Sequence, residues 1–158
     1  MAPLTVFDQL ALHPFLADLP AGWLHRLAVA GRPVLRHPGH RLFRQGAAAN
    51  RFWLLSSGAV ALEFPVQGRG DITIEVVRAG GVVGWSWLLE PYRWTLGAVV
   101  AEECRAVEFD AARVRELMAA DTDLGRELGQ RFLAVMADRL GAARVRLVEL
   151  YAYPEGPR

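Results

Sequence analysis

The sequence predicts an α+β fold, in which an antiparallel β-roll of the double-stranded jelly-roll type carries short N-terminal helices and a long C-terminal helix. Three observations predict it. In the middle of the chain, apolar residues recur at every second position, which is typical of strands with one buried face. Glycines that suit turns separate these runs, at positions 39, 46, 58, 68, 70, 80, 81, 84 and 97. After Asp110 the apolar residues follow a helical period instead.

Short helices are expected between residues 14 and 30. Apolar residues there fall near helical spacing, and Pro20 stands where a helix can begin. The sequence Gly31-Arg32-Pro33 then ends the helical pattern. The N-terminal part of the chain is therefore predicted to be helical up to the start of the roll.

Strands are expected between residues 33 and 109. Two runs show the alternation most clearly, with apolar residues at 60, 62 and 64 and again at 72, 74 and 76. The intervening Gln67-Gly68-Arg69-Gly70-Asp71 predicts a hairpin turn between them.

Two helices are expected after the strands. The first covers residues 111–120, and Asp121 or Asp123 can cap the second. The second helix is expected to run to about Leu150, some ~40 Å at the usual rise per residue. Residues 1–152 are thus predicted to form one domain, and residues 153–158, with Pro154 and Pro157, a flexible tail.

Composition excludes several classes of protein. A net charge of +1 argues against a strongly basic nucleic-acid surface. The single cysteine, Cys104, cannot form an internal disulfide or build a thiolate metal site, so a reducing compartment, the cytoplasm, is expected. The N-terminal segment has no basic region ahead of its apolar residues, and no apolar run is long enough for a membrane span.

Four segments in this order resemble the cyclic-nucleotide-binding domain family, which contains the catabolite activator protein-like sensor domains. They are residues 15–20 (FLADLP), 39–46 (GHRLFRQG), 52–60 (FWLLSSGAV) and 81–84 (GVVG). The resemblance covers roughly residues 15–150. It implies the β-roll and a cassette after Gly84 that presents backbone N–H groups to a phosphate at the start of a short helix, residues 86–89.

The resemblance implies a set of ligand-binding residues in the cassette and on the long helix. In the family an Arg neutralises the phosphate, and Arg93 is the basic residue of this segment, although counting back from the next strand puts Thr95 at that position. The expected ligand-binding residues are Gly84, Trp85, Ser86, Trp87, Leu88, Arg93, Trp94, Thr95 and Arg144.

Three departures from the family pattern disfavour cyclic AMP as the ligand. The family has a Glu after the glycine to accept from the ribose hydroxyl, and Trp85 at this position cannot accept a hydrogen bond. Trp94 follows Arg93 where the family often has a small residue. No Ser or Thr occurs after residue 122 to contact a purine from the long helix. The cofactor is therefore unknown, with a cyclic nucleotide disfavoured.

Trp85, Trp87 and Trp94 lie within ten residues, and two interpretations of this cluster stay open. The rings either fill the pocket as core or form an aromatic cage for a small anionic or aromatic ligand beside Arg93. The first supports a ligand-free interaction or scaffold domain, and the second a non-catalytic regulatory ligand sensor. The segment is also similar to stand-alone family members that lack a helix-turn-helix.

No enzyme or metal site is predicted. The sequence shows no nucleophile elbow, phosphate-binding loop or paired carboxylates. The four histidines are scattered, and His37 and His40 are expected in a solvated turn.

The long helix predicts a protein partner. Its apolar positions extend further than a small roll can cover, and exposed apolar stripes mark interfaces. A parallel homodimer, or docking onto another protein, is expected through Phe132, Val135, Leu140 and Leu147. Direct DNA binding is not expected, because eight residues after Leu150 are too few for a helix-turn-helix.

Overall fold

The computed structural model describes residues 3–152, so the expected tail at residues 153–158 lies outside the described residues. The helices are α1 (Val6–Leu12), the short 3-10 helix η1 (Pro14–Leu16), α2 (Ala21–Val29), the 3-10 helix η2 (Ser86–Leu88), α3 (Ala111–Ala120) and α4 (Thr122–Ala152). The strands are β1 (Gly31–Arg36), β2 (Arg41–Phe43), β3 (Arg51–Val66), β4 (Gly70–Arg78), β5 (Val82–Val83) and β6 (Gly97–Asp110).

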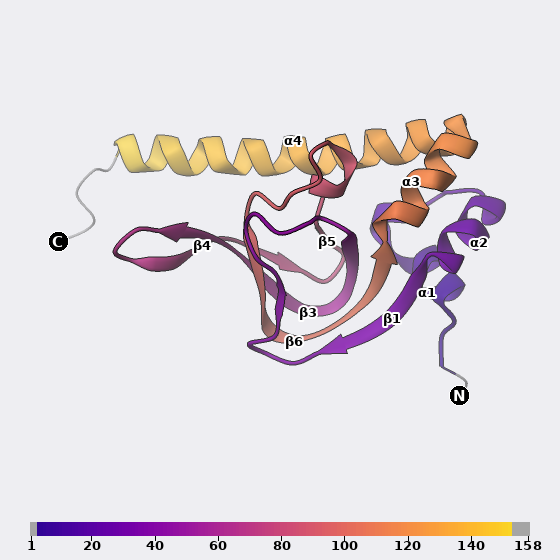
Figure 1. The fold of residues 1–158 in the computed structure, drawn as a ribbon, viewed down its shortest axis with the longest axis horizontal. Coiled ribbons are helices and arrows are strands. Elements are labelled where there is room, and N and C mark those ends of the chain that lie inside the picture. Colours follow the sequence, from indigo (N-terminus) through magenta and orange to yellow (C-terminus); the bar gives the residue numbers. More distant parts are fainter. Residues whose placement is uncertain (1–2, 153–158) are drawn as a thin grey trace.

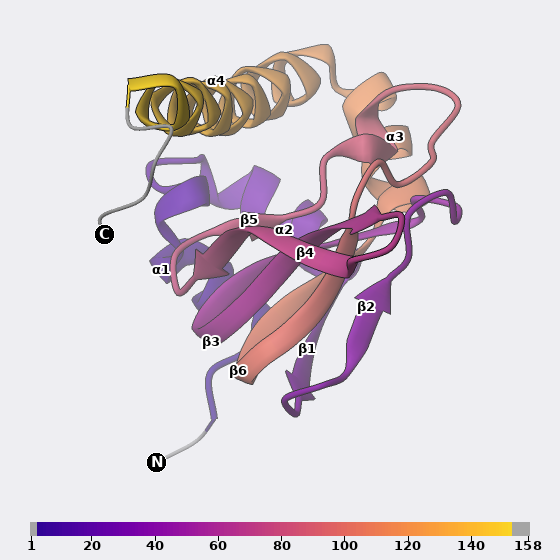
Figure 2. The ribbon, with the colours of Figure 1, turned by 90° about the vertical axis from the view of Figure 1, so that its left-hand side faces the viewer.

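The strands form one antiparallel sheet that curls into a roll, which confirms the predicted fold class (Figure 1). Its main order is β1-β6-β3-β4, while β2 also pairs with β6 and β5 with β3. The expected turn at residues 67–71 joins β3 to β4 as a hairpin. The helices α1, α2 and α3 gather at one end of the roll, and α4 runs from there across its top (Figures 1 and 2).

The first helix, α1, was missed by the sequence prediction, which began the helices at residue 14. A capping box starts it: the Thr5 hydroxyl accepts from the Asp8 backbone N–H, and the Asp8 carboxylate accepts from the Thr5 backbone N–H, both at 3.1 Å. Leu10 anchors the helix to the core, where it is fully buried. The capping residues were present in the sequence as Thr-x-x-Asp, so this helix was predictable.

The long helix α4 divides into a docked half and an exposed half. Asp121 caps its start by accepting from the Leu124 backbone N–H at 3.2 Å, and this hydrogen bond holds the pKa of Asp121 below its usual value. Residues 122–139 pack on the roll, whereas every residue from 140 to 152 is exposed. Figure 1 shows the exposed half extending over β4.

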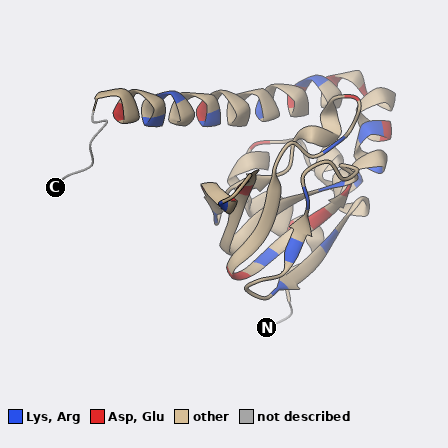
Figure 3. Ribbon diagram, turned by 60° about the vertical axis from the view of Figure 1, so that its left-hand side comes forward, with Lys and Arg blue, Asp and Glu red and all other residues tan. Residues whose placement is uncertain are grey.

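Part of the core lies between the sheet and the docked half of α4, and several aromatic rings pack together there. Phe52 of β3 stacks on Phe109 of β6 with centroids 4.6 Å apart, and Phe132 of α4 meets Phe52 edge-on at 5.6 Å. Both acidic and basic residues occur along the length of α4 (Figure 3). Among the described residues, no helix has an apolar stretch that could span a membrane.

Candidate ligand-binding cassette

The cassette begins where β5 ends, at a glycine that a side chain could not replace. Gly84 has φ of +97°, and a Cβ there would lie 2.8 Å from Cη2 of Trp94. After η2, residues 92–94 return alongside residues 46–49: the Trp94 backbone N–H donates to the Ala47 carbonyl at 2.9 Å, and the Ala49 backbone N–H to the Tyr92 carbonyl at 2.7 Å. The cassette is thus held at both ends by backbone contacts.

Trp87 belongs to the core and not to a ligand cage. Its ring stacks on Phe52 at 4.5 Å and meets Phe132 of α4 edge-on at 5.2 Å. Its indole N–H donates to the Gly84 carbonyl at 3.1 Å, so the one polar atom of the side chain is satisfied inside the protein. Trp87 therefore links the cassette to the docked half of α4.

Trp94 also packs as core. It is 5% exposed, and its ring lies parallel to Phe43 of β2 with centroids 3.7 Å apart. Trp53 of β3 lies next to the same pair, 6.2 Å from Trp94. The core interpretation of the cluster thus holds for two of the three tryptophans.

A hollow of about 20 Å³ lies between the cassette and the strands, and Trp85 lines it together with Trp94. This volume accommodates about one water molecule, whereas small-molecule sites usually measure roughly 300–1,000 Å³. Five of the nine residues expected to bind a ligand line this hollow, namely Gly84, Trp85, Ser86, Trp94 and Thr95.

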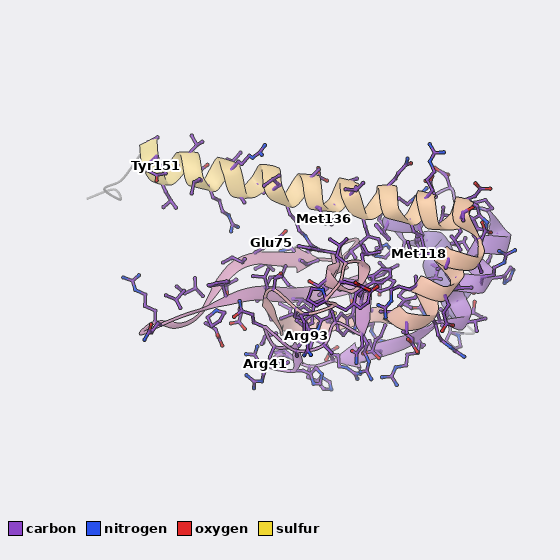
Figure 4. All side chains as sticks on the ribbon, turned by 45° about the horizontal axis from the view of Figure 1, so that its top comes forward. Arg41, Glu75, Arg93, Met118, Met136 and Tyr151 are labelled. Carbon is purple, nitrogen blue, oxygen red and sulfur yellow. The ribbon has the colours of Figure 1, made fainter. Side chains whose placement is uncertain are left out.

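Arg93 does not face the hollow. It is exposed, and its Nη1 donates to the Gly46 carbonyl at 3.3 Å. In Figure 4 the label of Arg93 lies among the strands, away from α4. Arg144 lies on the exposed half of α4, and Leu88 is not among the lining residues of the hollow. The structure therefore does not bring Leu88, Arg93 and Arg144 together with the rest of the expected set.

Arg139 of α4 is the cation that lines the hollow, and the sequence analysis missed it. Its Nη2 donates to the Val82 carbonyl, and its Nε lies 3.5 Å from a carboxylate oxygen of Glu75 on β4. Burial lowers the pKa of Arg139, and the charge of Glu75 opposes this effect. Arg139 follows Val135 by one helical turn, so a cation on the roll-facing side of the helix was the signal that could have revealed it.

A second arginine ties the cassette to α3. Nη1 of Arg115 donates to the Trp87 carbonyl at 2.9 Å, and the guanidinium carbon lies 4.2 Å from the ring centroid of Tyr92. Together with Arg139, it connects the cassette region to both C-terminal helices. The cassette is consequently fixed from two sides.

The four residues expected to form a dimer contact separate into two sets. Phe132 is 1% exposed, and Val135 is partly buried against the same core. Both contact the chain's own roll because they share the helix face of Leu124 and Leu128. Leu140 and Leu147 lie on the exposed half instead, at 52% and 56% exposure.

Within residues 3–152, no three potential metal ligands come together. His37, expected in a turn, lies with its Nδ1 3.3 Å from a carboxylate oxygen of Glu103, and both side chains are exposed.

Comparison with known proteins agrees with the fold. Residues 34–121 match the family described as cyclic nucleotide-binding domain. A search of curated proteins found no match.

Solved structures share the fold. A Geobacter metallireducens protein assigned to cyclic nucleotide binding superposes with a TM-score of 0.78 at 26% identity, covering 87% of this chain and 99% of that one. A cAMP-binding acyltransferase from Mycobacterium smegmatis gives 0.66 at 26% identity, with 87% and 41% covered. The Thermus thermophilus catabolite activator protein gives 0.68 at 21% identity, with 87% and 63% covered.

Proposed function

Since this chain belongs to the cyclic nucleotide-binding domain family, we propose that it is a non-catalytic regulatory module whose cassette is closed by its own side chains. It acts through protein contacts of α4, without a bound nucleotide. The observation that carries the proposal is the hollow of about 20 Å³, which Trp94 fills where a ligand would need space. The reducing cytoplasm expected for a chain with a single cysteine is part of this proposal.

The contacts around the closed cassette support a fixed position for α4. Trp87 packs against Phe132 of the helix, and Arg139 of the helix reaches Val82 and Glu75. In a ligand sensor, bound ligand would bias the position of such a helix. In the proposed module, Trp87 and Arg139 take over this role, so α4 is docked on the roll without a ligand.

The exposed leucines of α4 support a second copy of this chain as the partner. Leu133, Leu140 and Leu147 are exposed and recur every seven residues, the repeat that keeps one stripe of a helix against a parallel partner helix. Tyr151 continues the stripe, with 81% of its surface exposed. This stripe, Leu133, Leu140, Leu147 and Tyr151, lies about a quarter to a third of a turn away from the side that faces the roll.

The hairpin beneath the helix carries exposed apolar residues of its own. Phe64 of β3 and Ile72, Ile74 and Val76 of β4 are exposed apolar residues. Arg146 of α4 donates to the Ile74 carbonyl, which places this hairpin directly beside the exposed half. Apolar surface on both elements favours association, because burial removes it from water.

Thermal unfolding with added ligands and sedimentation of the purified chain test the two parts of the proposal. We expect cyclic AMP and cyclic GMP at millimolar concentration to leave the melting temperature unchanged, because a ligand stabilises a protein only by binding its native state. We expect sedimentation equilibrium to give the mass of a dimer. A nucleotide-induced rise in melting temperature contradicts the closed cassette, and a monomer at high concentration contradicts the helix contact.

A ligand sensor is the competing function, and Arg139 is the observation that favours it. Its guanidinium lines the hollow and could meet an anion there if Trp85, which is only half-buried, moved aside. Stabilisation by a small anion that disappears in Arg139→Met, but persists in Arg93→Met, supports the sensor over the closed module.

Catalysis is not part of the proposal. The acyltransferase from Mycobacterium smegmatis is similar to this chain over 41% of its own length, so most of that enzyme has no counterpart in the match. The contacts described for the cassette region are backbone hydrogen bonds, aromatic stacking and the Arg139–Glu75 ion pair. None of these pairs a nucleophile with a general base.

A further inference from the structure

A second and larger hollow lies away from the cassette, where the N-terminal segment meets the strands. It is a groove of about 840 Å³ lined by residues of α1, η1, β1, β3 and β6. Exposed apolar side chains form much of its wall, including Leu12, Pro14, Pro33 and Leu35. A groove of this size and character falls within the range of small-molecule sites.

The polar side chains of the groove are already satisfied within the protein, with one exception. The buried His13 directs Nε2 to the Leu55 carbonyl at 2.9 Å, and its Nδ1 accepts from the Phe15 backbone N–H at 3.2 Å. The Ser56 hydroxyl donates to the Arg105 carbonyl at 3.1 Å, and the Gln9 amide donates to the Leu4 carbonyl at 3.2 Å. These groups line the groove without offering a new charge.

Arg105 of β6 is the exception. Its guanidinium makes no ion pair within residues 3–152, and it is the one charged side chain among those lining the groove there. A guanidinium matches a carboxylate with two parallel hydrogen bonds. The groove thus combines a long apolar wall with a single cation at its lining.

We propose that this groove binds a monomeric long-chain carboxylate, with the apolar chain along Leu12, Pro14 and Leu35 and the carboxylate on Arg105. Charge complementarity favours this class of ligand, because a single unpaired cation can bind one anionic group. The apolar wall can bury an unbranched apolar tail. The site is separate from the cassette, so it can be occupied whether or not the cassette is closed.

Fluorescence titration of the full chain with dansyl-undecanoic acid, below its micelle concentration, tests the proposal. We expect dansyl emission to rise on binding, and decanoate to displace the probe better than decanol. In Arg105→Gln we expect decanoate to bind about fivefold more weakly, the upper end for an exposed ion pair, with decanol unchanged. Leu35→Glu should abolish binding, because it places a like charge in the apolar wall.

Arg69→Gln, in the exposed β3–β4 turn, is the matched control and should bind like the wild type. Absence of a dansyl response, or full binding by Leu35→Glu, overturns the site. Equal competition by decanol and decanoate overturns the role of Arg105. If Leu35→Glu instead converts a dimer to a monomer in sedimentation, the groove is a contact between copies and the ligand proposal is wrong. Circular dichroism of each variant confirms that it folds.

Discussion

At Gly84 the missing side chain lets the Trp94 ring lie against the backbone of the cassette, and that one contact closes the hollow. Single residues decide several other properties in the same way. Arg139 brings a cation from α4 to β4 and β5, and His13 joins η1 to β3 through the Leu55 carbonyl. Arg139 and His13 therefore act through partners far away in the sequence.

His13 predicts a dependence of stability on pH. Burial lowers the pKa of His13 below its usual value of 6.5, although the hydrogen bond to Leu55 opposes this. The unfolded chain therefore takes up a proton at this histidine before the folded chain does. The free energy of unfolding should fall as the pH drops below about 6.5 and level off once the pH is below the folded-state pKa.

Urea denaturation between pH 5 and pH 8 measures this dependence. His13→Gln keeps a donor for the Leu55 carbonyl but cannot titrate, so its slope against pH should be smaller than that of the wild type. His40→Gln, at an exposed position, should retain the wild-type slope. Equal slopes for His13→Gln and the wild type would show that His13 does not cause the effect.

The sequence predicted which cassette residues lie together better than it predicted their roles. Gly84, Trp85, Ser86, Trp94 and Thr95 do line one hollow, because a short contiguous segment keeps its members close. Whether Trp87 and Trp94 were core or cage could not be decided, since their partners Phe52 and Phe43 come from other strands. Arg139 was missed because its role depends on where α4 crosses the roll.

Among the elements, α4 shows two kinds of environment within one continuous helix. Its docked half packs Leu124, Leu128 and Phe132 into the core. The leucine stripe begins at Leu133, on the outer side of that half, and continues along the exposed half. Arg139 lies at the end of the docked half, and its contacts with Val82 and Glu75 are the last to join that half to the roll. Glu75 lies below α4 in Figure 4, and Tyr151 marks the far end of the exposed half.

Replacing Arg139 should loosen the helix. Arg139→Met removes a charge-assisted hydrogen bond and leaves Glu75 without this partner, so we expect a loss of about 1.5–3 kcal/mol in unfolding free energy. Arg144→Met, on the exposed half of the same helix, should change it by less than about 0.5 kcal/mol. Guanidinium denaturation measures both, and equal stabilities of the two variants would contradict a role for Arg139 in holding α4.

Elements with a strong local pattern were predicted well from the sequence. The alternation at residues 60–64 and 72–76 gave β3 and β4, and the helical period after Asp110 gave α3 and α4. The period could not separate the docked stripe from the exposed one, because both are apolar and overlap along the same helix. For that reason Phe132 and Val135 were expected at a partner surface, although they face the roll.

At the scale of the whole molecule, the proposed dimer should depend on the leucine stripe. Leu140→Arg places two charges in a symmetric helix contact and removes two buried leucines, worth about 1.5 kcal/mol each, so the dimer dissociation constant should rise about 100-fold. Val145→Arg is the matched control: Val145 is 58% exposed on the same half of α4 but lies on a different side of the helix.

Sedimentation equilibrium measures both dissociation constants. We expect Leu140→Arg to be monomeric at concentrations where the wild type and Val145→Arg are dimers. If both arginine variants dissociate equally, general charge repulsion explains the result and the stripe has no special role.

The position of β6 has a consequence for how this chain folds. β6 pairs with β1, β2 and β3, so Gly31 at the start of β1 meets Phe109 near the end of β6. Pairings that join such distant residues close long loops, and chains rich in them fold slowly. During synthesis, the roll cannot close before residue 110 has left the ribosome. The aromatic core cannot form completely until Phe132 has been added as well. Until then the apolar faces of β3 and β4 stay open to water, and exposed apolar surface of this kind favours aggregation.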